Sequence, residues 1–178
     1  MTRYAALLRG INVGGRAKLS MSELRGALAS LGLEDVVTYI QSGNVVFRSA
    51  ATPTEIARDL EQRIAEAFSL ETTVVLRTAA ELASIAGDNP YAARGTEPRT
   101  LHVVFLGGAP GAEDVARLDP ERSPPDSFTV RGSEIYVCFP NGSGRSKLTL
   151  DYFERNLDVR ATMRNWSTVV RLVELTRG

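Results

Sequence analysis

The order of helix-start signals and apolar runs in residues 1–77 is the feature that most constrains the fold of this 178-residue chain. Capping boxes that begin at Ser20 and Thr52 predict two helices, and apolar residues recur every four positions after the second box. Apolar runs at residues 4–8, 36–40, 45–47 and 73–76 predict four strands. The order strand–helix–strand–strand–helix–strand predicts an α+β fold of the ferredoxin-like type.

The second half of the chain shows a related but less regular pattern. Its apolar runs and turn residues predict a strand, a helix, a hairpin and two helices, at residues 101–106, 111–118, 128–139, about 148–157 and about 165–175. We therefore expect a second ferredoxin-like subdomain, modified with C-terminal helices. The expected division is a first subdomain at residues 1–77, a short helix and linker at 78–99, and the second subdomain at 100–178.

Composition excludes several classes of protein. The chain has one cysteine, Cys138, and one histidine, His102, so it can form neither an internal disulfide nor an ordinary zinc site, and we expect no cofactor. A lone cysteine fits a reducing compartment, and no apolar run reaches the length of a membrane span. These features predict a cytoplasmic protein without a membrane partner.

A nine-residue pattern, N-x-[GS]-G-R-[AS]-K-L-[ST], occurs twice, at residues 12–20 and 141–149, and it contains both lysines of the chain. Each copy follows a strand-like run and ends on a Ser or Thr that can cap a helix. Arg and Lys are poor choices at this point for stability alone, because a cation opposes the helix dipole. A bound anion reverses that penalty. The two copies therefore predict two anion-binding loops.

The ferredoxin-like order brings further polar groups to the first copy, because its first two strands run parallel and end at the same edge of the sheet. The hairpin after the second strand then lies beside the loop after the first strand, and both offer amide, hydroxyl and backbone donors. The predicted ligand-binding residues are Arg9, Asn12, Gly14, Gly15, Arg16, Lys18, Gln41, Ser42 and Asn44, together with Arg145, Lys147, Arg164 and Asn165 in the C-terminal part. We expect the two loops to converge on one basic cleft.

Four residues allow both structural and functional interpretations: Asn165, Trp166, His102 and Cys138. We expect Asn165 to cap the last helix and Trp166 to begin a buried stripe that continues through Val169, Val170 and Val173. Strand alternation predicts that His102 and Cys138 share the sheet face away from Leu101, which makes a Cys–His dyad conceivable. A buried structural cysteine is the commoner arrangement.

Two long segments resemble a known family. Residues 7–15 and 39–47, which read LLRGINVGG and YIQSGNVVF, are similar to the family catalogued as domain of unknown function 1697. Residues 144–149 and 161–166 resemble the C-terminal signature of the same family. The resemblance covers nearly the whole chain and implies a small bacterial protein with two α+β subdomains. It implies no reaction.

Three functions are compatible with these patterns. The first is a binding module for a phosphate-bearing or other anionic ligand, such as a nucleotide or nucleic acid. The second is an enzyme that acts on such a ligand, with Lys18 or Lys147 stabilising developing charge. The third is a protein-interaction module without a small ligand. Ligand-dependent turnover separates the first two.

Overall fold

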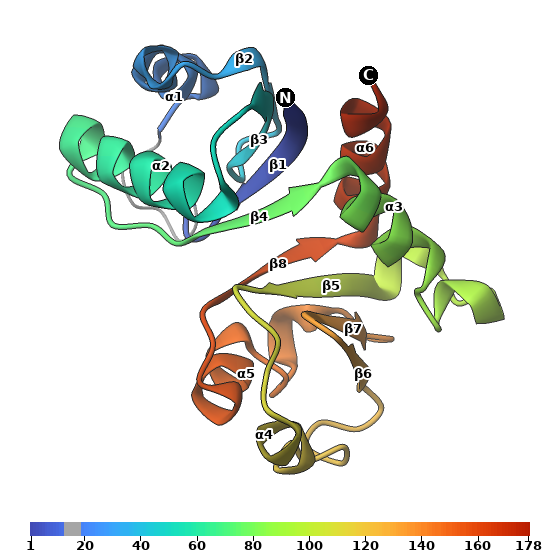
Figure 1. Ribbon diagram of the computed structural model, residues 1–178. Coiled ribbons are helices and arrows are strands. Elements are labelled where there is room, and N and C mark those ends of the chain that lie inside the picture. The colour runs from blue at the N-terminus through green and yellow to red at the C-terminus, as the bar shows by residue number, and fades with distance from the viewer. Residues whose placement is uncertain (13–18) are drawn as a thin grey trace. The chain divides into compact units, whose positions relative to one another are not determined.

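The computed structural model describes residues 1–12 and 19–178 and divides the chain into two compact units (Figure 1). Unit 1 comprises Met1–Leu82 and Leu172–Gly178, and unit 2 comprises Ala83–Arg171. Each unit contains a four-stranded antiparallel sheet, in the order β2-β3-β1-β4 in unit 1 and β6-β7-β5-β8 in unit 2. The predicted α+β fold with two ferredoxin-like subdomains is confirmed.

Unit 1 has the predicted strand–helix–strand–strand–helix–strand order. Its elements are β1 (Thr2–Leu8), α1 (Met21–Leu28), β2 (Glu34–Tyr39), β3 (Asn44–Ser49), α2 (Pro53–Phe68) and β4 (Val74–Thr78). Both predicted capping boxes are present: the hydroxyl of Ser20 accepts the N–H of Glu23, and the hydroxyl of Thr52 accepts the N–H of Glu55. The same hydroxyls donate to the two carboxylates, which lowers the pKa of both glutamates.

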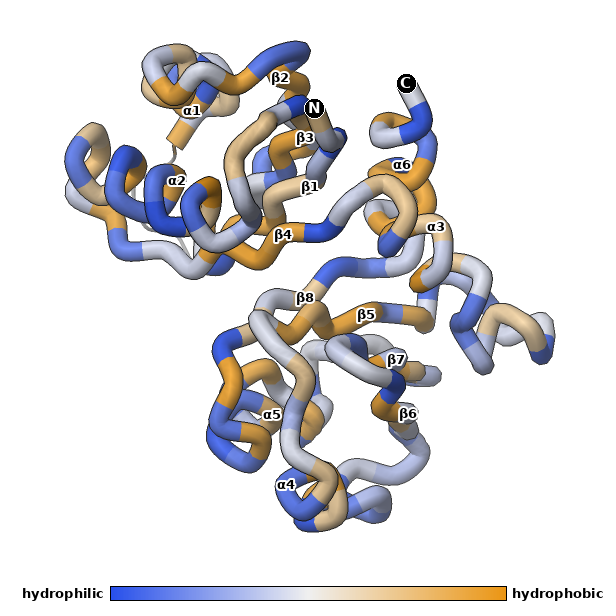
Figure 2. Tube along the Cα trace, viewed as in Figure 1, coloured by the Kyte–Doolittle hydropathy of each residue, from blue (hydrophilic) through white to orange (hydrophobic). Residues whose placement is uncertain are grey.

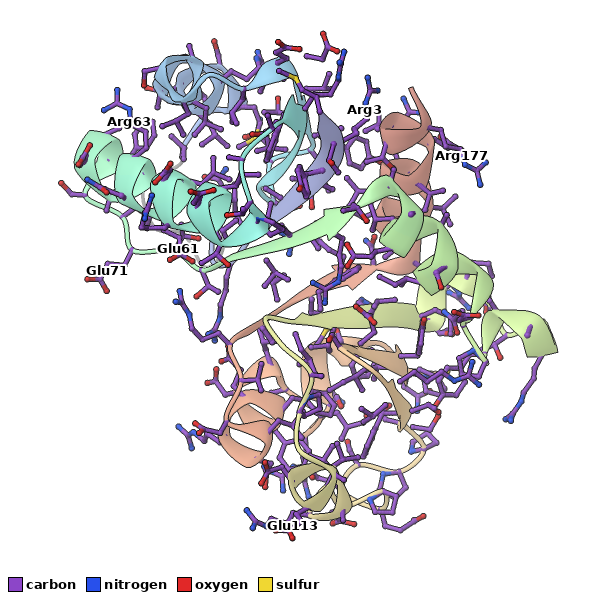
Figure 3. All side chains as sticks on the ribbon, viewed as in Figure 1. Arg3, Glu61, Arg63, Glu71, Glu113 and Arg177 are labelled. Atoms are coloured by element: carbon purple, nitrogen blue, oxygen red, sulfur yellow. The ribbon has the colours of Figure 1, made fainter. Side chains whose placement is uncertain are left out.

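The core of unit 1 lies between its sheet and the pair α1 and α2. Tyr4 on β1 lies opposite Phe47 on β3, and both are buried with apolar residues of the two helices. Hydrophobic residues along α2 are separated by stretches of hydrophilic residues (Figure 2), and the buried ones recur every four positions, as in an amphipathic helix. Polar side chains of α2 bond to neighbouring segments: Arg63 donates to the carbonyl of Ala27 in α1 (2.9 Å), and Glu61 accepts the N–H of Val74 in β4 (2.8 Å) (Figure 3).

Unit 2 repeats this order and contains one strand that the sequence did not predict. Its elements follow α3 (Ala79–Gly87), which begins in unit 1, and are β5 (Leu101–Leu106), α4 (Ala112–Ala116), β6 (Ser127–Arg131), β7 (Glu134–Cys138), α5 (Leu150–Leu157) and β8 (Ala161–Asn165). The last helix, α6 (Trp166–Arg177), begins in unit 2 and ends in unit 1. Short 3-10 turns occupy Ala29–Leu31, Ala92–Arg94, Pro98–Thr100 and Ser143–Arg145. The unpredicted strand is β8, which pairs with β5 and passes into α6 without a loop.

The buried face of α6 differs from the predicted stripe. Trp166 is only partly buried and Val170 is 40% exposed, whereas Val169, Leu172 and Val173 are buried. Thr176 extends this face because its hydroxyl donates to the carbonyl of Leu172 (2.8 Å), which satisfies the polar group inside the helix. The buried face of α6 is therefore formed by Val169, Leu172, Val173 and Thr176.

None of the helices formed by residues 1–12 and 19–178 is long and apolar enough to cross a membrane.

Candidate functional site

The loop after β1 and the turn between β2 and β3 lie side by side in unit 1, as the sequence predicted. The N–H of Leu8 donates to the carbonyl of Gly43 (2.8 Å). The side-chain amide of Asn12 donates to the carbonyl of Gln41 (2.7 Å). The structure thus brings Asn12 and Gln41 together at the end of the first sheet.

Most polar groups at this point are engaged in holding the backbone together. Asn12, at φ 56°, also donates to the carbonyl of Leu19 (2.8 Å) and accepts the N–H of Leu19 (2.7 Å). Asn44 is fully buried and donates to the carbonyl of Tyr39 (3.1 Å) and the hydroxyl of Ser42 (3.1 Å). These two amides therefore close the loop and the turn.

Gly43 makes the close approach of turn and loop possible. Its φ of 79° lies in the left-handed region. A Cβ at this position would lie 2.9 Å from Cγ1 of Ile11 and 2.9 Å from Cβ of Leu8. Glycine is thus required here by packing as well as by backbone conformation.

Most of the ligand-binding residues predicted in the first copy of the pattern are not described by the structure. Gly14, Gly15, Arg16 and Lys18 lie outside the described residues, so their role and the convergence of the two loops stay predictions. Arg9 is partly buried, and its carbonyl accepts the hydroxyl of Thr72 (2.8 Å).

The second copy of the pattern, residues 141–149, is described in full, and we call it the basic loop. Hydroxyl groups hold its backbone: Ser123 accepts the N–H of Lys147 (3.0 Å), and Ser146 accepts the N–H of Leu148 (3.0 Å). Thr149 caps α5 by accepting the N–H of Tyr152 (3.1 Å), as predicted. The basic loop is therefore braced at three points by side chains that carry no charge.

Two cations of the basic loop are left without partners. Arg145 and Lys147 are exposed, and neither side chain forms an ion pair or hydrogen bond with a described residue. Elsewhere arginines pair with nearby acids, as Arg117 does with Asp114 (3.0 Å). The loop itself contains no acidic residue. It therefore presents uncompensated positive charge before the N-terminus of α5.

Arg122 is a third cation beside the basic loop, and it was not among the residues predicted from sequence. Its Nε donates to the carbonyl of Lys147 (3.0 Å), and its guanidinium carbon lies 4.1 Å from the ring centroid of Tyr152. The hydroxyl of Tyr152 in turn accepts the N–H of Asp119 (2.8 Å). Arg122 stands between acidic residues in the sequence, Glu121 and Asp126, and its position became apparent only through this contact with the basic loop.

Arg164 and Asn165 lie at the end of β8 and have separate environments. Arg164 is 7% exposed and donates to the hydroxyl of Thr162 (2.7 Å) and the carbonyl of Met163 (2.8 Å). Burial lowers the pKa of Arg164 to about 10. No strand was predicted at residues 161–165, yet Arg164 belongs to one, because these residues complete the sheet. Asn165 is exposed and caps α6 by accepting the N–H of Thr168 (2.9 Å), as predicted.

The sheet register places these groups at one end of unit 2. Cys138, the last residue of β7, lies opposite Leu101, and Asn165, the last residue of β8, lies opposite His102. The carboxyl ends of β7 and β8 therefore flank the start of β5. The basic loop leaves from one of these ends and α6 from the other.

The same register excludes the Cys–His dyad. Cys138 shares a sheet face with Leu101, its direct partner, whereas His102 lies opposite Val137 and points to the other face. The predicted shared face was wrong, because alternation along each strand does not specify which residues of β5 and β7 pair. Within the described ranges, no three His, Cys, Asp or Glu side chains gather in a way that could hold a metal ion.

These features define a protein of two ferredoxin-like α+β units with an unpaired basic loop in the second. Residues 1–136 match the model of the family described as protein of unknown function DUF1697, and the chain belongs to that family. It is similar to the solved structure of a conserved bacterial protein from Streptococcus pneumoniae, with a TM-score of 0.78 and 25% sequence identity. The similarity covers 100% of this chain and 99% of that one. No curated protein matches the chain.

Proposed function

We propose that this protein binds a phosphate-bearing or other anionic ligand, a nucleotide or nucleic acid, through the basic loop. The observation that supports the proposal best is the state of Arg145 and Lys147. Both side chains are exposed, both stand on a backbone braced by hydroxyl groups, and neither has a partner among the described residues.

Electrostatics explains why this arrangement favours an anion. Two neighbouring cations repel each other, and both stand just before α5, where the helix dipole also disfavours positive charge. Neither side chain has a partner among the described residues that offsets this cost. A bound phosphate offsets it by charge-assisted hydrogen bonds to both side chains.

The proposal extends to the first copy of the pattern. Arg16 and Lys18 stand at the same places in residues 12–20 as Arg145 and Lys147 do in the basic loop. We also propose a bacterial origin and a cytoplasmic location, which the single buried cysteine and the resemblance to a bacterial protein support.

A thermal-shift experiment tests the proposal. Inorganic phosphate, ATP without metal, and a short single-stranded oligonucleotide serve as three probes. At least one probe should raise the melting temperature of the wild type, because a ligand of the native state stabilises it. The double variant Arg145→Gln/Lys147→Gln should lose most of that shift.

The matched control is Arg94→Gln/Arg155→Gln, which removes two other exposed cations of unit 2 that have no described partner. The control should keep the shift of the wild type. Equal shifts in both double variants, or no shift with any of the three probes, would overturn the proposal.

A further inference from the structure

We infer that Arg122 belongs to the anion site of the basic loop and that the ligand carries a terminal phosphate monoester. The inference rests on the proposed function and names its ligand class. It follows from the fixed position of Arg122, from the number of charges that gather with it, and from the absence of a neutralising carboxylate within the described residues.

Arg122 is held in place before any ligand arrives. The ring of Tyr152 lies 4.1 Å from its guanidinium carbon, and its Nε is used by the carbonyl of Lys147. Neither terminal nitrogen has a partner among the described residues. A planar guanidinium with two unused donors is suited to bidentate binding of phosphate oxygens, and little side-chain entropy is lost because the side chain is already ordered.

Arg122 and Lys147 can reach the same anion. The contact between Nε of Arg122 and the carbonyl oxygen of Lys147 is 3.0 Å, so the guanidinium lies beside the backbone from which the lysine side chain extends. Arg145 precedes Lys147 by two residues on the same loop. The site therefore offers two guanidinium forks and one compact ammonium.

Two acids close to Arg122 in the sequence bond to the backbone and to a serine and not to the cations. Asp119 accepts the N–H of Glu121 (2.9 Å), and Asp126 accepts the hydroxyl of Ser123 (2.9 Å). No carboxylate in the described part of the chain lies within ion-pair distance of Arg122, Arg145 or Lys147. The three cations are thus not neutralised within this part of the chain.

Three cations match a dianion better than a monoanion. A phosphate monoester carries about −1.5 to −2 charges near neutral pH, with a second pKa of about 6, whereas a diester carries one negative charge. A monoester also presents three terminal oxygens to the two forks and the ammonium. The chemical class is therefore the phosphorylated end of a nucleotide or oligonucleotide, and not its internal diester linkages.

Calorimetric titration with 5′-AMP and with 3′,5′-cyclic AMP tests this inference, because the two share base and sugar and differ in the phosphate ester. AMP should bind wild type at least about tenfold more tightly. The preference should weaken below a pH of about 6, where the monoester gains a proton and the cyclic diester does not.

Two variants test the role assigned to Arg122. Arg122→Gln should remove the preference for AMP, and Tyr152→Leu should reduce it, because Tyr152 positions the guanidinium. Arg155→Gln on α5 is the control and should keep it. A circular dichroism melt of each variant establishes that it is folded, and Arg122→Gln, a change at an exposed residue, suffices if Tyr152→Leu does not fold.

A second pair of probes separates the two sources of a terminal phosphate. An oligonucleotide with a 5′-phosphate should bind more tightly than the same oligonucleotide with a 5′-hydroxyl if the site accepts strand ends. Only AMP should bind if the site accepts mononucleotides alone.

Equal affinity for AMP and cyclic AMP, or a preference unchanged in Arg122→Gln, would overturn this inference and leave the proposed function standing. Failure of every anion to bind would overturn both.

Discussion

The turn of unit 1, residues 40–44, and the basic loop of unit 2 both contain glycine, serine and asparagine, and they use their polar groups differently. In the turn, the amide of Asn44 bonds to the backbone, and Asn12 ties the neighbouring loop to the carbonyl of Gln41. In the basic loop, serine and threonine hydroxyls fix the backbone, and the cations Arg145 and Lys147 are left over. A glycine-rich polar segment therefore qualifies as a ligand site where its strongest groups are not consumed by the fold.

The largest effect that this comparison predicts comes from filling the space at Gly43. Gly43→Ala should lower the free energy of unfolding by roughly 2–5 kcal/mol, because a left-handed φ and an overlap with two buried side chains both cost energy. Chemical denaturation measures the change. Gly10→Ala is the control: it has a similar φ of 72°, nothing lies within 4 Å of its added Cβ, and it should cost only about 1–2 kcal/mol. Equal losses in the two variants would show that the turn is not closely packed.

Asn12 should rank second, as the residue that ties the loop after β1 to the turn. Asn12→Gly keeps the left-handed φ accessible but removes the amide, so the free energy of unfolding should fall by about 1–3 kcal/mol. Gln41→Ala should change it by less than about 0.5 kcal/mol, since Asn12 bonds to the backbone carbonyl of Gln41. A variant of Asn12 as stable as the wild type would assign this amide to ligand binding instead of closure.

Removal of the cations from the basic loop should not lower the free energy of unfolding, in contrast to the changes at Gly43 and Asn12. We expect Arg145→Gln/Lys147→Gln to leave the free energy of unfolding unchanged or to raise it by up to about 1 kcal/mol, because both cations oppose the dipole of α5. Denaturation in ligand-free buffer, with Arg94→Gln/Arg155→Gln alongside, measures this. A loss of stability confined to the loop variant would mean that these cations serve the fold, and the contrast with the turn would disappear.

The smallest predicted effect is a loss of stability at acidic pH that depends on His102 in unit 2, the only histidine of the chain. Burial lowers the pKa of His102 below its ordinary value near 6.5, and a backbone hydrogen bond with Thr100 partly opposes this. The unfolded chain therefore binds a proton at His102 more readily than the native state does. The stability that neutral His102 contributes is present above a pH of 6.5 and is lost as the pH falls below that value.

His102→Gln checks this sign. Between a pH of about 7 and about 5, the free energy of unfolding should fall more steeply in the wild type than in the variant, before carboxylates begin to titrate. Parallel curves for the two proteins would show that His102 is equally solvated in both states.

The fold of unit 1 could be predicted almost completely from sequence, because its signals are local. The capping boxes at Ser20 and Thr52 and the spacing of apolar residues in α2 each act within a few residues of the chain. Residues 161–165 lack such a signal. They contain one alanine and one methionine among polar residues, and only pairing with β5 makes them a strand.

The residues of the candidate site likewise fall into those that the sequence could identify and those that it could not. The sequence identified the basic loop, since two lysines and a repeated pattern are visible in one dimension. It could not identify Arg122, whose place depends on an aromatic ring 30 residues further along the chain and on a carbonyl 25 residues away. It also could not show that Arg164 is buried in a strand, because the strand itself has no local signal.

Titration of isotope-labelled protein with 5′-AMP, followed by backbone amide NMR, observes the turn and the basic loop in one experiment. The amide resonances of Gly144, Arg145 and Lys147 should shift in a saturable way and by more than those of Gly43 and Asn44. The shifts should vanish in Arg145→Gln/Lys147→Gln and persist in Arg94→Gln/Arg155→Gln. Saturable shifts at the turn with none in the basic loop would contradict the account.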